Sequence, residues 1–571
     1  MSDMPDPPIL EDDAAWHKKE GLLWPDDSLV QQHFTDREAL IAKEKSQRSD
    51  RVFRENMSET ARNAAVIVEN IRKEEMTTLW TNDFEESLAK TNIDVYPGMM
   101  FSLARERMES SKLFKIVRKM PKGALLHCHF EAMVEFRYIL EDAFEMPGLY
   151  FKSPEPLNST EALGGANVEF ERLTESPAHT SASIWSSEYT PGAVSPLNQV
   201  ADSFPDGGRA GFVAWMATRT AITPSESLRH HDGPGAIWKK FGSAFMIIRT
   251  IIYHPPILRR YVRRLCQQLH DDGVEYADVR GVFTDPQKTL AEQPSVEIVN
   301  IFAEEVEAFK NSAEGKGFWG MRIIWTWVRV FSKRSILEGM KACIKVKKAR
   351  PDLIAGFDFV GQEDIGRPLK DLIPEIIWFE EQCKKEHLNI PFFFHAGETL
   401  GTGDDTDENL FDAIMLGTRR IGHGFSLFKH PLLIDMVKER SILIESCPVS
   451  NEVLRYTSSI RSHPLPALLA RGVPCALAND DPAILFEGKA GMSHDFWQAL
   501  QGWDNLGFAG LGSLAENSVR WATLEDYTRE EWLKSVNDGA QDKGIRGKRL
   551  RQWHESWEQY CQWVVSEFGT K

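Results

Sequence analysis

From residue 237 onward the chain alternates short apolar runs with charged amphipathic stretches, and this rhythm constrains the fold more than any other feature. The apolar runs are typical of buried strands, and the stretches between them are typical of helices. Together with an earlier run, eight strands are predicted, at 124–130, 274–283, 321–330, 353–360, 391–395, 419–425, 441–447 and 473–479. Eight successive βα units predict an α/β fold of the (β/α)8 TIM-barrel type. A doubly wound sheet is the alternative, but no glycine-rich phosphate loop follows the first strand.

A barrel does not use the whole length of 571 residues, so the chain is expected to carry additions. We assign residues 120–540 to the barrel and expect an irregular insertion at about 151–236, because that stretch is rich in Ser, Thr, Pro and Gly. Residues 1–26 are expected to be disordered. Residues 27–119 are expected to form a helical N-terminal extension, and residues 541–571 a C-terminal helix.

Composition excludes several classes of protein. Hydrophobic residues make up 42% and charged residues 26%, as in ordinary globular proteins. The formal net charge of −17 argues against a nucleic-acid partner, which needs clustered Lys and Arg. No apolar run approaches the ~18 residues of a membrane span. The seven cysteines are scattered without a CxxC pair, and the acidic N-terminus does not resemble a signal peptide, so a cytoplasmic location is expected.

Polar side chains that can bind a metal follow several of the predicted strands. His127 and His129 end the first strand, and residues i and i+2 of a strand face the same side. Two imidazoles held side by side are a good start on a divalent metal site. The competing interpretation is a pair of unrelated polar residues, because HxH is a short pattern.

Two further histidines lie beside glycines. His395 ends the fifth strand in the sequence HAGE, where Gly397 allows a sharp turn that returns Glu398 to the same cavity. Glu398 could then serve as a general acid or base. His423, flanked by glycines in the sixth strand, could be a base or could orient a metal-bound water. A solvated glutamate and a structural histidine are the alternatives.

The eighth strand ends in two adjacent carboxylates, Asp480 and Asp481, before a proline. Buried together without partners they would repel each other, unless a cation and a ligand donor relieve that repulsion. An Asx turn is the alternative. The strand ends together supply four nitrogen and oxygen ligands that suit one Zn²⁺ per chain, namely His127, His129, His395 and Asp480.

These motifs resemble those of the adenosine deaminase family, and within it the adenosine deaminase-related growth factors. The similar stretches are MPKGALLHCH (120–129), AGFDFVGQED (355–364), FFFHAGET (392–399), RIGHGFSLFKHP (420–431), ESCPVSNEVL (445–454) and NDDPAILF (479–486). The order HAGE, GHG, DDP makes this resemblance specific.

The resemblance implies a role for each residue. The four ligands named above match the family's zinc ligands. Glu398 matches the acid that protonates purine N1, and His423 matches the residue that activates the zinc-bound water. Asp481 matches the carboxylate that contacts N7, and Gly361 matches the backbone N–H donor to N3. Trp238 resembles a tryptophan that lies over the substrate.

The implied activity is the zinc-dependent hydrolytic deamination of adenosine and 2'-deoxyadenosine to inosine and 2'-deoxyinosine plus ammonia, in which a zinc-activated water attacks C6. The family often has an aspartate that contacts the ribose shortly after the second zinc histidine; here Phe130 and Glu131 stand there, so Glu131 becomes the substrate-binding candidate. Secreted members have a signal peptide and a disulfide in the insertion, and neither is apparent. The resemblance also implies a homodimer through the N-terminal helices.

Several alternatives remain open. A two-metal hydrolase of the same superfamily would need a modified lysine at the end of the fourth strand, where residues 359–362 contain none. A cytidine-deaminase-type enzyme would need H-x-E and P-C-x-x-C, which are absent. The substrate could instead be an adenine nucleotide or a modified adenosine, and a catalytically inactive nucleoside-binding protein is the remaining alternative.

Overall fold

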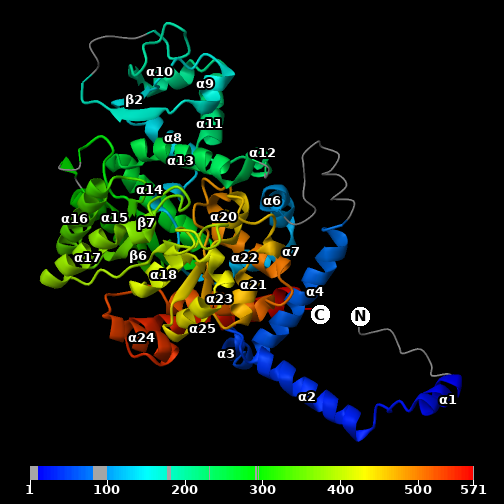
Figure 1. The fold of residues 1–571 in the computed structure, drawn as a ribbon. Helices are drawn as coiled ribbons and strands as arrows, with labels where there is room; N and C mark the ends of the chain where they lie inside the picture. Colours follow the sequence, from blue (N-terminus) through cyan, green and yellow to red (C-terminus); the bar gives the residue numbers. More distant parts are fainter. Residues whose placement is uncertain are drawn as a thin grey trace.

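A computed structural model describes residues 11–81, 100–175, 182–229, 232–289, 292–293 and 295–569. The remaining parts of the expected N-terminal, insertion and C-terminal regions lie outside the described residues. Figure 1 shows a central barrel with the insertion at one end and the helices of residues 11–45 reaching away from it. Among the described helices, none combines the length and the apolar character that crossing a bilayer requires.

The described strands of the centre form a parallel barrel. One four-stranded sheet has the order β1-β5-β6-β7 and the other the order β11-β10-β9-β8. Their bounds are Gly123–Leu125 (β1), Val274–Gly281 (β5), Gly320–Val328 (β6), Ile354–Val360 (β7), His395–Ala396 (β8), Arg420–His423 (β9), Leu443–Ser446 (β10) and Cys475–Leu477 (β11). Parallel bridges join Cys128 to Asp480 and Phe357 to Phe392, and these two contacts close the barrel. The predicted (β/α)8 fold is confirmed.

Amphipathic helices surround the strands, as the charged stretches predict. In α14, for example, Ile257, Leu258, Tyr261, Val262 and Leu265 are buried at the i, i+3, i+4 spacing of a helix face. The helices that follow the strands are α14 (Pro255–Asp271), α15 (Ser295–Lys310), α16 (Lys333–Ala349), α17 (Leu369–Lys385), α18 (Asn409–Met415), α19 (Pro431–Glu439), α20 (Pro448–Val453) and α21 (Leu465–Ala470).

The C-terminal helices close the amino-terminal side of β1. They are α22 (Gly491–Gly502), α23 (Gly507–Arg520), α24 (Arg529–Asp538) and α25 (Ile545–Phe568). Gly123 at the start of β1 has φ +77°, and a Cβ there would lie 2.6 Å from the Val519 side chain. The Ser518 hydroxyl accepts a hydrogen bond from Ala124 N at 2.9 Å. Only glycine allows this close approach of strand and helix.

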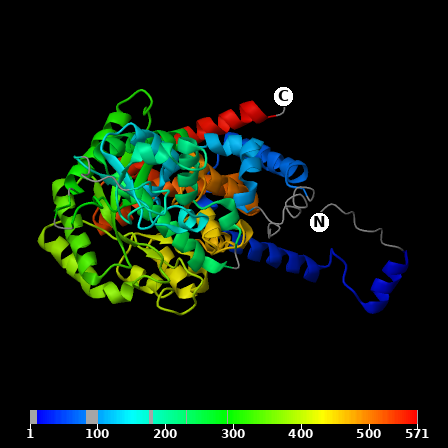
Figure 2. The ribbon, with the colours of Figure 1, turned by 90° about the horizontal axis from the view of Figure 1, so that it is seen from above.

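The N-terminal region is helical in its described parts, with α1 (Glu11–Glu20), α2 (Ser28–Lys45), α3 (Arg51–Glu55), α4 (Glu59–Thr78), α6 (Phe101–Ser110) and α7 (Lys112–Lys119). Helix α4 packs against α25, whereas α1 and α2 form an arm that projects from the body (Figures 1 and 2). The expectation of disorder over residues 1–26 is wrong for residues 11–20. Lys18 and Lys19 lie in the last turn of α1, where positive charge favours the helix through its dipole.

The insertion is also more regular than expected. It holds a three-stranded antiparallel sheet of β2 (Leu149–Lys152), β3 (Glu169–Arg172) and β4 (Ser195–Pro196). Aromatic rings form its small core, with Phe151, Phe170, Phe212, Trp185 and Trp215 in mutual contact. The associated helices are α8 (Phe136–Phe144), α9 (Thr160–Gly165), α10 (Leu197–Asp202), α11 (Gly208–Arg219), α12 (Pro224–Ser227) and α13 (Gly233–Ile252).

Candidate active site

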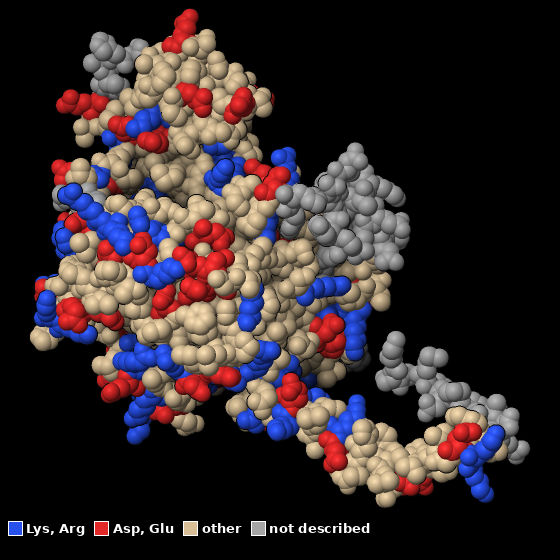
Figure 3. All heavy atoms as spheres, in the orientation of Figure 1, with Lys and Arg blue, Asp and Glu red and all other residues tan. Residues whose placement is uncertain are grey.

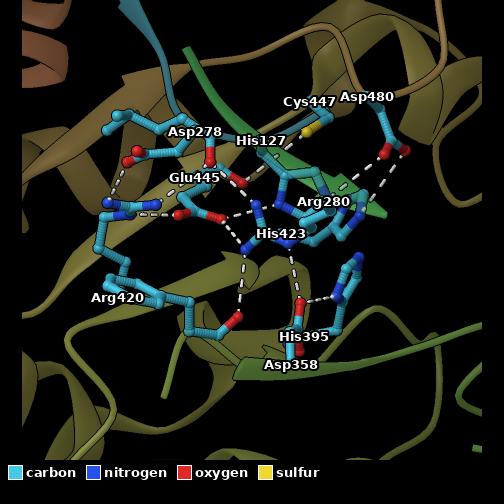
Figure 4. Close-up of polar contacts among 12 residues, drawn as sticks. His127, Asp278, Arg280, Asp358, His395, Arg420, His423, Glu445, Cys447 and Asp480 are labelled. Atoms are coloured by element: carbon cyan, nitrogen blue, oxygen red, sulfur yellow. Dashed lines mark hydrogen bonds and ion pairs between the residues drawn. The ribbon is translucent and has the colours of Figure 1, made fainter. Parts of the chain in front are cut away.

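The predicted metal ligands converge at the carboxyl ends of the barrel strands (Figure 4). The ring centroid of His127 lies 5.4 Å from that of His129 and 4.5 Å from that of His395. The Nε2 atoms of His127 and His129 lie 3.3 and 3.2 Å from Asp480 Oδ1. Three strands far apart in sequence, β1, β8 and β11, therefore bring these side chains to one point.

The donor atoms fit a cation. One nitrogen from each of the three histidines lies within 4.8 Å of the others. His127 Nε2 and Asp480 Oδ1 are buried and have no hydrogen-bond partner. Burial lowers the pKa of His395 to about 3, so its imidazole is neutral and its lone pair is available. Unpaired buried donors of this kind are costly unless an ion binds them.

Cys447 also lies near His127, His423 and Asp480 and forms a second group that could hold a metal. Burial, followed by the charge of Asp480, raises the pKa of its thiol well above the ordinary value. The thiolate is the form that binds metals, so Cys447 is a poor ligand here. The histidines and Asp480 are the better donor set.

The other ring nitrogens of two ligands are held by buried carboxylates. His127 Nδ1 lies 2.8 Å from Glu445 Oε2, and His395 Nδ1 lies 2.7 Å from Asp358 Oδ2. Such contacts place the ring proton on Nδ1 and direct Nε2 toward a metal. Burial alone would raise the pKa of Asp358, but His395 and Arg280 outweigh it and lower that pKa.

Two buried arginines complete this layer beneath the site, which we call the charged floor: Arg280, Arg420, Asp278, Asp358 and Glu445. Arg280 donates to Asp358 at 2.8 Å and to Glu445 at 2.6 Å. Arg420 donates to Asp278 at 2.8 Å and also contacts Glu445. All five residues are fully buried. Sequence analysis missed the floor, although charged residues inside apolar strand runs were a usable signal.

Helix α20 supports the site from the side. The Ser450 hydroxyl donates to Asp480 Oδ2 at 2.7 Å, and the Asn451 amide contacts His423 Nδ1 at 3.2 Å. His423 and Asp480 have φ values of +59° and +56°, in the left-handed region that non-glycine residues rarely adopt. Backbone strain of this kind is typical of functional sites.

A cavity of about 330 Å³ opens above the converged ligands. Every predicted site residue except His127, which lies beneath it, lines this cavity: His129, Glu131, Trp238, Gly361, His395, Glu398, His423, Asp480 and Asp481. Aromatic and aliphatic side chains form most of the remaining wall. Trp238 is fixed by a hydrogen bond of 2.9 Å from its Nε1 to the Tyr456 hydroxyl. Wide apolar walls with a few polar groups are typical of small-molecule sites.

Glu398 is a carboxyl group of the wall that lacks a charged partner. Its Oε1 is buried without a hydrogen-bond partner and lies 3.6 Å from His423 Nε2. Burial, followed by the charges of Asp480 and Glu363, raises its pKa well above the ordinary value. Its backbone N–H donates to Glu363 Oε1 at 2.9 Å, so Glu363, which sequence analysis missed, shapes this turn.

Glu131 lies on the opposite side of the cavity. Its Oε1 accepts hydrogen bonds from the Tyr253 hydroxyl at 2.7 Å and from Val282 N at 3.3 Å. Arg249 is the one Lys or Arg among the described residues that line the cavity, and it donates to Thr284 at 3.1 Å. A larger hollow of about 710 Å³ lies between α3, α23 and α25, and none of the predicted site residues lines it.

Comparison with known proteins identifies the family. The profile described as adenosine deaminase matches residues 225–539. The chain belongs to the adenosine deaminase family. This membership makes it a deaminase, a hydrolase, and it confirms the resemblance found in the sequence, including the subgroup.

Relatives cover most of the chain. Adenosine deaminase 2-A of Danio rerio is 30% identical, covering 77% of this chain and 83% of its own. An adenosine deaminase of Lutzomyia longipalpis is 33% identical, covering 76% and 81%. Among solved structures, an amidohydrolase from Burkholderia ambifaria, described as having bound Zn, has a TM-score of 0.50 at 15% identity, covering 80% of this chain and 95% of that one. The last comparison supports the barrel fold only.

Proposed function

We propose that this chain is a zinc-dependent adenosine deaminase that converts adenosine and 2'-deoxyadenosine to inosine and 2'-deoxyinosine with release of ammonia. One observation carries the proposal: the unpaired Asp480 Oδ1 and the unpaired carboxyl of Glu398 line one cavity, and the unpaired His127 Nε2 lies 3.3 Å from that Asp480 oxygen. Relatives named adenosine deaminase support it. The cavity volume also falls within the range of small-molecule sites.

The ligands His127, His129, His395 and Asp480 would hold one zinc ion per chain. When bound, zinc would lower the pKa of a water molecule and so supply a nucleophile near neutral pH. The charged floor orients the two anchored imidazoles, His127 and His395, by occupying Nδ1 of each ring. The protein's part is thus to direct Nε2 of both rings toward the ion.

Two wall carboxyls are suited to donate protons to a purine. The raised pKa of Glu398 favours its protonated form, from which it can deliver a proton to N1. Burial and the charge of Asp480 also raise the pKa of Asp481, which can donate a hydrogen bond to N7. Gly361 and Trp238 also line the cavity, and we assign the N–H of Gly361 to N3 and Trp238 to the ring face.

The charge of the cavity favours a nucleoside over a nucleotide. Its lining holds four carboxyl groups, from Glu131, Glu398, Asp480 and Asp481, against the single guanidinium of Arg249. A phosphate would find one Lys or Arg among the described lining residues, Arg249, which already donates to Thr284. Arg249 is the one observation that favours an adenine nucleotide as the second candidate substrate.

The cell location and oligomeric state remain proposals. All seven cysteines are free and buried, which supports a reducing compartment such as the cytoplasm. The expected homodimer would use the N-terminal helices, where Leu29, Phe34 and Leu40 of α2 are exposed. Native mass would test this, and a monomer at micromolar concentration would count against the dimer.

Metal analysis and a substrate panel test the proposed function. Purified protein should contain about one zinc per chain, and chelation should abolish turnover and lower Tm until zinc is restored. The panel holds adenosine, 2'-deoxyadenosine, adenine, AMP and N6-methyladenosine, followed by ultraviolet absorbance. We expect the two nucleosides to react fastest. A zinc-loaded protein that deaminates none of them would refute the proposal.

A further inference from the structure

Two buried side chains, those of Asn451 and His463, connect the candidate catalytic histidine His423 to a backbone N–H. His423 Nδ1 lies 3.2 Å from the Asn451 amide nitrogen, and Asn451 Oδ1 lies 3.0 Å from His463 Nε2. His463 Nδ1 in turn lies 3.1 Å from the backbone nitrogen of Leu465. Asn451 and His463 are 1% and 7% exposed, so water does not compete freely for these contacts.

The backbone N–H fixes every proton along this chain. An amide N–H can only donate, so His463 Nδ1 must be the acceptor and His463 must carry its proton on Nε2. That proton needs an acceptor, which is the oxygen of Asn451. The amide group of Asn451 then donates to His423 Nδ1, which must carry a lone pair. Burial lowers the pKa of His463 to about 3, which agrees with a neutral ring.

We infer that Asn451 and His463 are positioning residues that hold neutral His423 in the tautomer with its proton on Nε2. Asn451 is well placed for this, since its backbone carbonyl accepts hydrogen bonds from Tyr456 N at 2.8 Å and Thr457 N at 3.1 Å. These two bonds hold the backbone of Asn451 in place, so that its side chain can accept from His463 and donate to His423.

The tautomer decides what His423 can do. Its Nε2 lies 3.6 Å from Glu398 Oε1 and 3.7 Å from Asp480 Oδ2, so the proton points among the reacting groups. With Nδ1 occupied as an acceptor, neutral His423 has no lone pair at Nε2 and cannot serve there as a base. It acts as a hydrogen-bond donor that orients the attacking oxygen. This role, though not the tautomer itself, rests on the proposed function.

Asn451→Asp is the sharpest test, because aspartate has the same shape but only accepts hydrogen bonds. It should draw the His423 proton to Nδ1 and leave a lone pair at Nε2. We expect kcat to fall by about 10³-fold or more with KM little changed, since tautomer reversal lowers kcat by about 10⁴ in serine proteases. Asn517→Asp, at a half-buried amide bonded to Cys475 O at the far end of the barrel, is the matched control.

Nitrogen NMR of ¹⁵N-histidine-labelled, zinc-loaded protein reads the tautomer without reference to activity. The His423 signals are identified as those lost in His423→Asn. The wild type should show a protonated Nε2 and an unprotonated Nδ1, and Asn451→Asp should reverse them. A protonated Nδ1 in the wild type overturns the inference, whether or not the enzyme deaminates adenosine. Wild-type kcat in a folded Asn451→Asp variant overturns the donor role.

Two substitutions at His463 supply an independent check that does not depend on the folding of Asn451→Asp. His463→Gln keeps a donor toward Asn451, whereas His463→Phe keeps the ring shape without one. We expect kcat to be within about tenfold of wild type for His463→Gln and to be considerably lower for His463→Phe, with mixed His423 tautomers in the latter. Equal kcat values and one unchanged tautomer in both variants overturn the inference.

Discussion

The floor and the wall of the site bury carboxyl groups to the same degree but shift their pKa values in opposite directions. Burial alone would raise the pKa of Glu445 in the floor, but the contacts that it accepts from Arg280, Arg420 and His127 lower that pKa. Glu398 in the wall has an oxygen without a hydrogen-bond partner, and burial raises its pKa. Partners, not depth, therefore decide the charge of a buried carboxyl in this barrel.

The paired carboxylates of the floor and the unpaired carboxyls of the wall therefore suit two different roles. Paired charges beneath the ligands are fixed in geometry and protonation, so they orient imidazoles. Unpaired carboxyls above the ligands have raised pKa values, which favour the protonated form that a proton donor needs. If the contrast is correct, removing a floor partner should damage folding, whereas removing a wall carboxyl should damage turnover alone.

The largest effect is expected for Arg280→Met, which breaks the floor. Asp358 and Glu445 would each lose a buried cationic partner, and breaking a buried ion pair destabilises by about 3–5 kcal/mol. We expect zinc content and turnover to fall together with the free energy of unfolding. Urea unfolding measures the loss, and Arg37→Met on the exposed part of α2 is the control. Unchanged stability would remove the distinction between floor and wall.

Glu398→Gln tests the wall. Glutamine keeps the shape but has no acidic proton, so kcat should fall by about 10²–10⁴-fold. Zinc content and the free energy of unfolding should stay close to wild type, because no paired charge is lost. Steady-state kinetics and metal analysis measure both. Full activity would show that the proton comes from elsewhere.

Glu452 sharpens the comparison, because it is a buried carboxyl outside the cavity whose partners are the backbone N–H groups of Phe101 and Ile460 rather than cations. Burial raises its pKa to about 8. The folded protein therefore keeps this proton at pH values at which the unfolded chain has released it. The stability that the bound proton contributes is complete at acidic pH and is lost as pH rises toward and past 8. In Glu452→Gln, we expect the fall in unfolding free energy between pH 5 and pH 9 to be smaller by about 1–3 kcal/mol. Parallel urea titrations at those two pH values measure this, and identical pH slopes would contradict the shifted pKa.

The smallest effect is expected from deleting residues 1–45, which include the projecting arm. Helix α2 has no buried residues, so its loss removes no packing from the barrel. We expect a change of less than about 0.5 kcal/mol in stability and an unchanged kcat. Thermal unfolding and kinetics measure both, and native mass shows whether the arm joins two chains. A strongly destabilised product would place the arm in the folded core.

The barrel, and the convergence of the strand-end side chains in one place, were predictable because strand runs and strand-end residues are local features of the sequence. The partners of His127 and His395 were not, because Glu445 and Asp358 reach them from strands far apart in sequence. The same holds for the Asn451 and His463 chain. In the insertion, serine and proline content concealed the aromatic residues around Phe151 that build a small core.

The Cys128–Asp480 bridge makes the candidate site part of the closure of the barrel. It joins the first strand of the barrel to the last, and His127 and His129 stand on one side of this seam with Asp480 on the other. An ion bound by all three would link the first strand to the last and so hold the ring of strands closed. The barrel would then be closed at the same place where the candidate site lies. A chain without the ion would be inactive and would have a weaker contact between these two strands.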